Sequence, residues 1–290
     1  MSKKGLGTLF VSVSATAFGT YSYFALMSAK AGFRPVPMLF YRFGLAALIL
    51  ALLAVFTRTK LPSRRQVAAL AGLGCLYVGQ SFAYILCLRA SNPITASLLL
   101  YIYPAFVTIG SVLFLKEKLT KTVILALLCA LFGSVLVVGP VREISGLAIL
   151  YGLGTSIFYA TYLIVGKRVL ADVPPLGATL VILSTAALVY GAASLFTGFD
   201  LPANPSGWIG PVCLALVATV IAIGGLLAGL RWISPVEASS LSALEPLVTA
   251  VLAVVILGQR LEWWHVAGGA LVILAVLVLA RHAGRVETSR

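Results

Sequence analysis

The chain has 290 residues, of which 61% are hydrophobic and only 10% charged, and its formal net charge is +13. An ordinary soluble domain has a far larger charged fraction, so this composition excludes one. The basic residues form short clusters at the ends of apolar stretches rather than one continuous face, which argues against nucleic acid as a partner. The composition therefore predicts a protein that spans the membrane several times and contacts lipid.

Ten apolar stretches follow one another along the chain, and each is long enough to cross a hydrocarbon core as a helix. They cover approximately residues 6–29, 37–56, 67–88, 93–115, 122–139, 146–166, 176–197, 208–230, 235–257 and 263–280. The first stretch is too long for the hydrophobic region of a signal peptide and lacks a convincing cleavage site, so we expect it to be retained. The sequence predicts an all-α integral membrane fold of ten transmembrane helices.

The basic residues also predict how the chain is oriented. Of the 21 Lys and Arg residues, 15 fall on the side of the two termini and 6 on the other side. Cytoplasmic loops are enriched in Lys and Arg, so both termini are expected to be cytoplasmic. The richest clusters all agree: Arg58, Lys60, Arg64, Arg65, Lys116, Lys118, Lys121, Lys167 and Arg168.

The chain contains an internal repeat with an offset of 142 residues. Residues 88–97 align without a gap on residues 230–239, and the same offset brings Pro104 onto Pro246 and Lys118-Leu119 onto Arg260-Leu261. Each copy has room for about five spans, and an odd number of crossings makes the second copy enter the membrane from the opposite side. We therefore predict two inverted five-helix repeats, residues 1–140 and 141–290. This architecture is typical of secondary transporters, with the site at the midplane between the halves, and it makes a monomer sufficient.

Two acidic residues lie within a predicted span, both in the ninth. Glu237 ends the sequence Ser234-Pro235-Val236-Glu237, which is typical of a capping box, so we assign it to structure. Glu245 follows Pro235 by ten residues, about 15 Å deeper at the helical rise, and so lies near the midplane. An acid there costs roughly 2.5 to 3.5 kcal/mol and is a functional candidate by default. The alternative is a neutral, buried Glu245 bonded to backbone carbonyls that Pro246 leaves free.

The repeat places Tyr103-Pro104 opposite Glu245-Pro246, and both prolines are predicted to kink their helices at mid-depth. Paired breaks at matching depth commonly frame a substrate site, although membrane helices also tolerate proline for structural reasons. Polar and aromatic residues gather at this level. The predicted substrate-binding residues are Gln80, Tyr84, Tyr101, Tyr103, Ser242, Glu245, Tyr21 and Tyr159.

Structural explanations compete with this interpretation at several positions. Small residues let helices approach closely, as in Gly225-x-x-x-Gly229 and its repeat partner Ala83-x-x-x-Cys87, and serines bond across helices. Interfacial belts explain many membrane tyrosines. Arg42 lies about one turn inside the second span, where it could neutralise an anionic substrate, but we expect it to snorkel toward the periplasmic face.

The four cysteines lie within predicted spans and are expected to serve as packing residues. Because no Cys/His cluster has ligand spacing, we predict no disulfide and no metal. The sequence has no phosphate-cradling motif such as Walker A, and we predict no cofactor and no ATP-driven step within this chain.

The helix entries Asn92-Pro93 and Ser234-Pro235, the two mid-helix pairs and residues 115–119 together resemble the drug/metabolite transporter superfamily. The match looks like two EamA domains, at approximately residues 6–140 and 146–281, and is most similar to bacterial aromatic amino-acid and metabolite exporters. The resemblance implies ten helices, a central cavity, alternating access and export across the bacterial inner membrane. The second copy has Gln259 where the first has Glu117, so a pairing made by that acid need not be duplicated. Neither the fourth nor the ninth span has a lysine like those that bind anions in sugar-phosphate relatives, which disfavours a phosphorylated substrate.

These observations suggest a zwitterionic amino acid at the midplane, with its side chain against tyrosines and its polar ends bonded to Gln80, Ser242, Glu245 and kink carbonyls. Rocking of the halves would expose the substrate to either side, driven by proton exchange or by facilitated efflux. A competing hypothesis is an integral-membrane enzyme that uses Glu245 and Arg42 on a lipid-like substrate, but a catalytic constellation is missing, and we expect no enzymatic activity. A passive channel and a transporter of another metabolite or drug are further alternatives.

Overall fold

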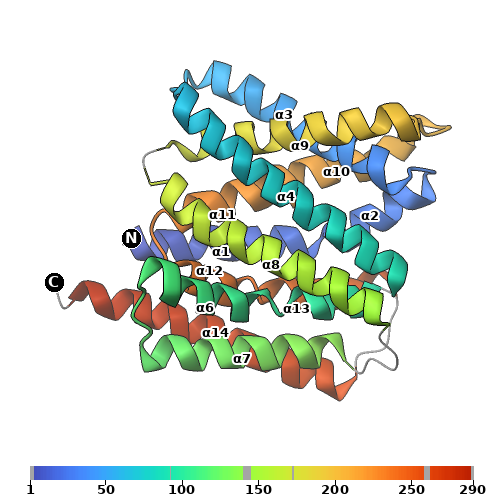
Figure 1. The fold of residues 1–290 in the computed structure, drawn as a ribbon. Coiled ribbons are helices and arrows are strands. Elements are labelled where there is room, and N and C mark those ends of the chain that lie inside the picture. The colour runs from blue at the N-terminus through green and yellow to red at the C-terminus, as the bar shows by residue number, and fades with distance from the viewer. Residues whose placement is uncertain (1–2, 92, 140–144, 172, 258–261, 289–290) are drawn as a thin grey trace.

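The computed structural model describes residues 3–91, 93–139, 145–171, 173–257 and 262–288. Within these residues every regular element is helical, and the two chain ends lie at the same end of the bundle (Figure 1). We call this the terminal end and the opposite one the distal end. Four residues of the predicted repeat pattern lie outside the described residues: Asn92, Gln259, Arg260 and Leu261.

The helices of the first half are α1 (Lys3–Gly19), α2 (Tyr21–Lys30), α3 (Pro35–Phe56), α4 (Arg64–Ala90), α5 (Pro93–Leu100), α6 (Tyr103–Leu115) and α7 (Lys121–Val138). The helices of the second half are α8 (Gly146–Val169), α9 (Pro175–Thr197), η1 (Pro205–Trp208), α10 (Ile209–Ala215), η2 (Leu216–Ile221), α11 (Ala222–Leu230), α12 (Pro235–Leu241), α13 (Leu244–Leu257) and α14 (Trp263–Thr288). Several of these segments are consecutive pieces of one interrupted span.

Among the described residues, eight helical stretches are long and apolar enough to cross a membrane, and two shorter apolar helices, at Lys121–Val137 and Trp263–Val278, complete the set. Large apolar side chains are exposed on the outside of the bundle, for example Phe56 and Phe196, the latter 91% exposed. Such a surface is stable only against lipid. The predicted ten-helix all-α membrane fold is confirmed.

The two halves pack on each other through pseudosymmetric pairs of helices. In one pair α4 of the first half contacts α8 of the second, and in the related pair α11 of the second half contacts α1 of the first. Extensive contacts also join α3 to α9 and α7 to α14, which are counterparts in the two repeats. This exchange of equivalent contacts is the packing expected of two repeats related by pseudo-twofold symmetry.

Side-chain caps begin several of these helices. Ser63 forms a capping box with Gln66 at the start of α4, and Ser234 forms one with Glu237 at the start of α12. The Ser145 hydroxyl accepts from the Ala148 amide at the start of α8. Because each cap satisfies amides that lack an intrahelical partner, it fixes where the span begins. The predicted structural role of Glu237 is confirmed.

Close helix contact explains the glycine pair in α11. A Cβ added at Gly229 would lie 2.4 Å from Val11 Cγ2 and 2.9 Å from the Gly7 carbonyl oxygen in α1. The pseudosymmetric contact is looser, because α4 presents Cys87 to α8, with its thiol 3.4 Å from the Ala148 carbonyl oxygen. Small residues therefore act at these interfaces by letting backbones approach, as predicted for this pair.

In the described part of the chain, four interruptions divide the spans. Tyr101 and Ile102 separate α5 from α6, and Ser242 and Ala243 separate α12 from α13. These two breaks lie just ahead of Tyr103-Pro104 and Glu245-Pro246. The other two were not predicted: a turn at Thr20 between α1 and α2, and a π-helix, η2, between α10 and α11.

Candidate functional site

A cavity of about 460 Å³ lies at the level of the helix breaks and is walled by both halves of the chain. Its lining continues toward the distal end, where Val137 near the end of α7, His265 near the start of α14 and Leu26 in α2 belong to the wall. These segments lie away from the chain termini in Figure 1. The cavity therefore extends from mid-depth toward the distal end.

Most of the residues predicted to bind substrate lie in this wall. The lining includes Gln80, Tyr84, Tyr101, Tyr103, Glu245, Tyr21, Tyr159 and the kink residue Pro246. Pro104 is buried but does not belong to the cavity lining. Ser242 also lies outside it, because its hydroxyl donates at 3.0 Å to the Ala238 carbonyl oxygen within its own helix. Its side chain is also a hydrogen-bond partner of Tyr103, which belongs to the wall, so Ser242 supports the wall and does not line the cavity directly.

Glu245 is the second residue of α13, and its amide donates to the Ser242 carbonyl oxygen at 3.0 Å across the helix break. Its partly exposed side chain lines the cavity, with the Tyr101 hydroxyl as a hydrogen-bond partner. The Thr249 hydroxyl bonds both the Glu245 carbonyl oxygen, at 3.0 Å, and the Gly19 carbonyl oxygen, at 2.9 Å. The unpredicted break after Gly19 therefore lies against the predicted break before Glu245.

Tyrosines from both halves form an aromatic wall. The rings of Tyr103 and Tyr159 meet edge to face, with centroids 4.7 Å apart, and the Tyr159 ring stacks on that of Tyr162 at 6.1 Å. The Tyr103 hydroxyl lies 3.5 Å from the Ser239 carbonyl oxygen, at the limit of hydrogen bonding. Rings held this way present apolar faces and polar edges to the same space.

Gln80 is fixed in the wall by three contacts. Its side-chain nitrogen donates to the Thr155 hydroxyl at 3.2 Å, and its side-chain oxygen accepts from Ser81 at 3.3 Å. The Thr155 hydroxyl in turn donates to the Gln80 carbonyl oxygen at 3.0 Å. Since a primary amide has two donors and two acceptor positions, one of each stays available to a ligand.

The prediction that Arg42 snorkels toward the membrane surface is wrong. Its side chain is only 4% exposed and lines the cavity. Nε donates to the Thr219 hydroxyl at 2.7 Å and Nη2 to the Ala218 carbonyl oxygen at 3.0 Å, both in η2. The guanidinium carbon also lies 4.7 Å from the centre of the Tyr21 ring. The buried acceptors and the Tyr21 ring stabilise the guanidinium inside the protein, so the side chain does not need to extend to water at the membrane surface.

Some polar residues of the wall are not among the predicted substrate-binding residues. Tyr77, Ser81, Thr249 and His265 all line the cavity. Tyr77 had a usable signal, because it shares one helix face with Gln80 and Tyr84 at spacings of three and seven residues. His265 had none, since its place at the distal mouth depends on how α14 packs against α7.

The family follows from a comparison with known proteins. The model of the "EamA-like transporter family" matches residues 5–139 and 146–281. The chain belongs to this family. It is 27% identical to the "Uncharacterized transporter YyaM" of Bacillus subtilis, over 84% of this chain and 84% of that protein. It is 28% identical to the "Uncharacterized inner membrane transporter YedA" of Escherichia coli K12, over 89% of this chain and 85% of that protein.

A solved crystal structure shows the same fold. It superposes with a TM-score of 0.82 at 17% sequence identity, and the match covers 96% of this chain and 98% of the chain in that structure. At that identity the likeness concerns the fold alone. Together with the family match, it makes this chain a multi-pass membrane protein of the EamA transporter family, built for a small-molecule substrate.

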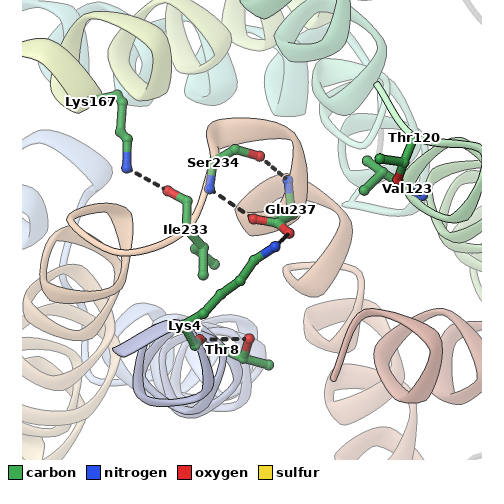
Figure 2. Close-up of polar contacts among 8 residues, drawn as sticks. All are labelled: Lys4, Thr8, Thr120, Val123, Lys167, Ile233, Ser234 and Glu237. Atoms are coloured by element: carbon green, nitrogen blue, oxygen red, sulfur yellow. Dashed lines mark hydrogen bonds and ion pairs between the residues drawn. The ribbon is translucent and has the colours of Figure 1, made fainter. Parts of the chain in front are cut away.

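In this EamA protein the terminal end is fastened by charged side chains around the turn between α11 and α12 (Figure 2). Lys4 of α1 pairs with Glu237 at 2.7 Å, and Glu237 also accepts from the Ser234 amide at 3.0 Å. Lys167 of α8 donates to the carbonyl oxygens of Leu230 at 2.6 Å and Ile233 at 2.8 Å. These contacts tie helices of both halves to one turn. We call them the terminal clasp.

An ion pair also bridges the halves at the distal end. Asp200, after α9, accepts from the Arg34 backbone amide at 2.7 Å and from its Nε and Nη2 at 2.9 Å and 2.7 Å. The Arg34 guanidinium holds the pKa of the Asp200 carboxyl below its usual value, chiefly through these hydrogen bonds. The pair joins two loops at the rim and leaves the cavity itself unblocked.

Proposed function

We propose that this EamA-family protein is a secondary transporter that exports amino acids, principally aromatic and apolar ones, and related small metabolites by alternating access. The observation that carries the proposal is the mid-depth cavity at the paired helix breaks, where one acidic, one basic and several tyrosine side chains share a wall built by both repeats. Such breaks between inverted repeats are where secondary transporters bind substrate.

The wall suits a molecule with an apolar body and charged ends. Tyr103 and Tyr159 offer ring edges and faces, and an aromatic pair contributes about 0.5 to 1.5 kcal/mol beyond the area that it buries. Glu245 would accept from the substrate ammonium group, and Gln80 would supply a further polar contact. The volume lies within the usual range for small-molecule sites. These features favour a free amino acid over a phosphorylated or purely lipid-like compound.

The two ends of the molecule support an alternating-access cycle. The terminal clasp fastens one end, while the cavity wall continues to the distal end. Rocking of one half against the other would release the clasp and narrow the distal mouth, so that the site faces the terminal side. Because both repeats are present in one chain, a monomer suffices for this cycle.

The orientation we propose places both termini in the cytoplasm and the protein in the bacterial inner membrane. The basic clusters from Arg58 to Arg65 and from Lys116 to Lys121 lie at the terminal end, as the positive-inside rule requires of a cytoplasmic side. The distal end would then be periplasmic. A phosphatase fused to the C-terminus should be inactive in cells, whereas one fused after Gly198 should be active; the reverse pattern would overturn this orientation.

Counterflow in liposomes tests the function. The purified protein is reconstituted in liposomes loaded with unlabelled phenylalanine, and labelled phenylalanine is added outside. Transient accumulation above protein-free liposomes is expected. A flat trace beside a working control carrier would contradict amino-acid transport, a new product in a detergent extract would indicate an enzyme, and flux without saturation or counterflow would indicate a channel.

Coupling to protons is tested at the same site. Glu245 is the acidic residue of the described wall. We propose that it binds and releases a proton during each transport cycle. Glu245→Gln should flatten the pH dependence of efflux, whereas the exposed Glu262→Gln should leave it intact. An unchanged pH profile in a well-expressed Glu245→Gln variant would reject proton coupling through this residue.

A further inference from the structure

Arg42 is a cation held deep in an apolar protein. It is the eighth residue of α3 (Pro35–Phe56), and the corresponding helix of the second half, α9, has no Lys or Arg in its sequence. An arginine inside a membrane span is unfavourable on insertion scales, and the repeat alone gives no reason for it. Its place in the cavity wall suggests that the charge is used there.

The guanidinium is positioned by the π-helix η2. Thr219 is fully buried, and its hydroxyl accepts from Arg42 Nε while donating at 2.8 Å to the Leu214 carbonyl oxygen five residues earlier. Nη2 of Arg42 bonds the carbonyl oxygen of the neighbouring Ala218. The matching residues of the first half, 74–79, are regular helix within α4. The repeat fold therefore does not require a π-helix at this position. We attribute the π-helix to its contacts with Arg42, because η2 provides both acceptors of the guanidinium.

Hydrogen-bonding capacity remains on Arg42 after these contacts. A guanidinium has five N–H donors in a planar fork. The two bonds to η2 use one on Nε and one on Nη2, and the Tyr77 hydroxyl is a third partner, which leaves two donors for a ligand. The Tyr21 ring lies against the guanidinium and restricts the orientation of its plane. A planar fork with donors at a cavity wall is the geometry that binds a carboxylate through two parallel hydrogen bonds.

The opposite charge stands in the same cavity but comes from the other half. Glu245 of α13 interacts electrostatically with Arg42 of α3. The described wall has one acidic residue, Glu245, and one arginine, Arg42. A ligand with an ammonium and a carboxylate group would complement both. A ligand with only one of them would leave the other protein charge without its partner in a site shielded from water.

We infer that Arg42 is the carboxylate-binding residue of this cavity, that Thr219 is its positioning residue, and that Arg42 and Glu245 together select zwitterions. The inference rests on the proposed transport function and adds its specificity. The substrate carboxylate lies on the Arg42 fork, the ammonium group lies against Glu245, and the tyrosine wall receives the side chain. Phosphate monoesters are rejected because Arg42 offsets only part of their nearly double negative charge, and Glu245 in the same cavity repels it.

Competition with single-charge analogues tests the inference. Labelled phenylalanine counterflow is measured against unlabelled phenylalanine, phenethylamine, which lacks the carboxylate, and 3-phenylpropionate, which lacks the ammonium group. Each analogue should compete roughly 10- to 100-fold less well than phenylalanine, the effect of losing a charge-assisted hydrogen bond. Equal competition by phenethylamine in the unmodified protein would overturn the role of Arg42 while leaving amino-acid transport standing.

Variants then assign the effect to residues. Arg42→Gln should raise the KM for phenylalanine by about tenfold or more and remove the preference over phenethylamine, and Arg42→Lys should restore part of it. Thr219→Val should raise KM by a few fold, and Thr219→Ser should recover it, since serine keeps the hydroxyl. The matched controls are the exposed Arg89→Gln and Thr161→Val, the latter removing a hydroxyl bonded within α8.

Each outcome separates the two proposals. If the unmodified protein carries phenylalanine and Arg42→Gln keeps both its KM and its preference, the inference is wrong and the function stands. If the unmodified protein carries phenethylamine but not phenylalanine, both fail, and the cavity selects cations. If Arg42→Gln does not fold, judged by size-exclusion chromatography, the Arg42→Lys and Thr219→Val variants decide, and unchanged competition in both overturns the inference.

Discussion

The sequence motif that reveals the repeat occurs at both ends of the molecule, and its two copies are fastened differently. At the first, distal copy the last carbonyl of α4, on Ala90, accepts from the Ser145 hydroxyl at 2.9 Å. At the second, terminal copy the last carbonyl of α11, on Leu230, accepts from the Lys167 ammonium group at 2.6 Å. The turn of the first copy is therefore held by a neutral hydrogen bond and that of the second by a charge-assisted one.

The difference teaches how a symmetric scaffold becomes directional. Charge-assisted hydrogen bonds are roughly twice as strong as neutral ones, so the turn at the terminal end is held more firmly than the repeated turn at the distal end. The cavity wall reaches the end whose turn has the neutral fastening. The same division runs through the site, where Glu245 of the second copy replaces Tyr103 of the first. The repeat determines the arrangement of the helices, and the positions where the two copies differ in sequence make the two ends of the molecule unlike.

The close contact between α11 and α1 gives the strongest way to break the pseudosymmetry. Gly229→Ala places a Cβ against the Gly7 carbonyl and Val11 of α1, and overpacking of this kind destabilises by about 1 to 3 kcal/mol. Gly154→Ala is the matched control at the related contact, because its Cβ would lie 3.9 Å from Ala83 Cβ, an ordinary distance. The Tm in detergent should fall for the first and hold for the second. Equal Tm values would mean that the two contacts are equally loose.

Removing the terminal clasp should open the end that it fastens. Lys167→Met leaves the Leu230 and Ile233 carbonyl oxygens without their ammonium donor, a loss of about 1.5 to 3 kcal/mol for a hydrogen bond to a charged group. In a cysteine-free background, the buried Ser240→Cys should then react with a membrane-impermeant thiol reagent at least several-fold faster from the terminal side. Lys121→Met, an exposed residue at the start of α7, is the control. An unchanged labelling rate would show that the clasp does not gate this end.

The neutral fastening at the distal copy should matter less. Ser145→Ala removes both the cap on the Ala148 amide and the bond to the Ala90 carbonyl oxygen, with an expected loss of about 1 kcal/mol. Thr120→Ala is the comparison, because Thr120 caps the Val123 amide of α7 (Figure 2) and has no cross-helix bond among the described contacts. The Tm should fall further for Ser145→Ala than for Thr120→Ala, yet less than for Lys167→Met. A larger fall than for Lys167→Met would reverse the comparison of the two ends.

Much of this arrangement follows from local sequence. The spans depend on continuous apolar runs, and the level of Glu245 follows from its distance of ten residues from the helix entry at Pro235. Tyr101 and Tyr103 could be predicted in the wall because they stand beside the break, whatever the rest of the chain does. Each of these inferences needs only residues within one helix or its repeat partner.

The errors arise where distant residues decide. Arg42 turns inward because Thr219 and Ala218, 177 and 176 residues away, offer acceptors that no pattern in its own span reveals. Ser242 donates to the Ala238 carbonyl oxygen of its own helix and does not line the cavity directly, a choice that the sequence leaves open. Side-chain direction thus depends on which acceptor is nearest in the fold, and depth along a helix does not determine it.

The Arg34–Asp200 pair should make the smallest contribution, and one that depends on pH. The Asp200 pKa is held below its usual value, so the stabilisation is present above the unfolded-state pKa of about 3.9 and is lost as the pH falls through the lower folded-state value. Arg34→Gln should therefore lower the Tm slightly at pH 7, and this difference from the unmodified protein should vanish in strong acid. Screening by solvent keeps the effect small, because the Arg34 side chain is 56% exposed. A difference that persists in strong acid would assign the effect of Arg34 to packing rather than to its charge. The distal end would then lack any ionic fastening to set against the terminal clasp.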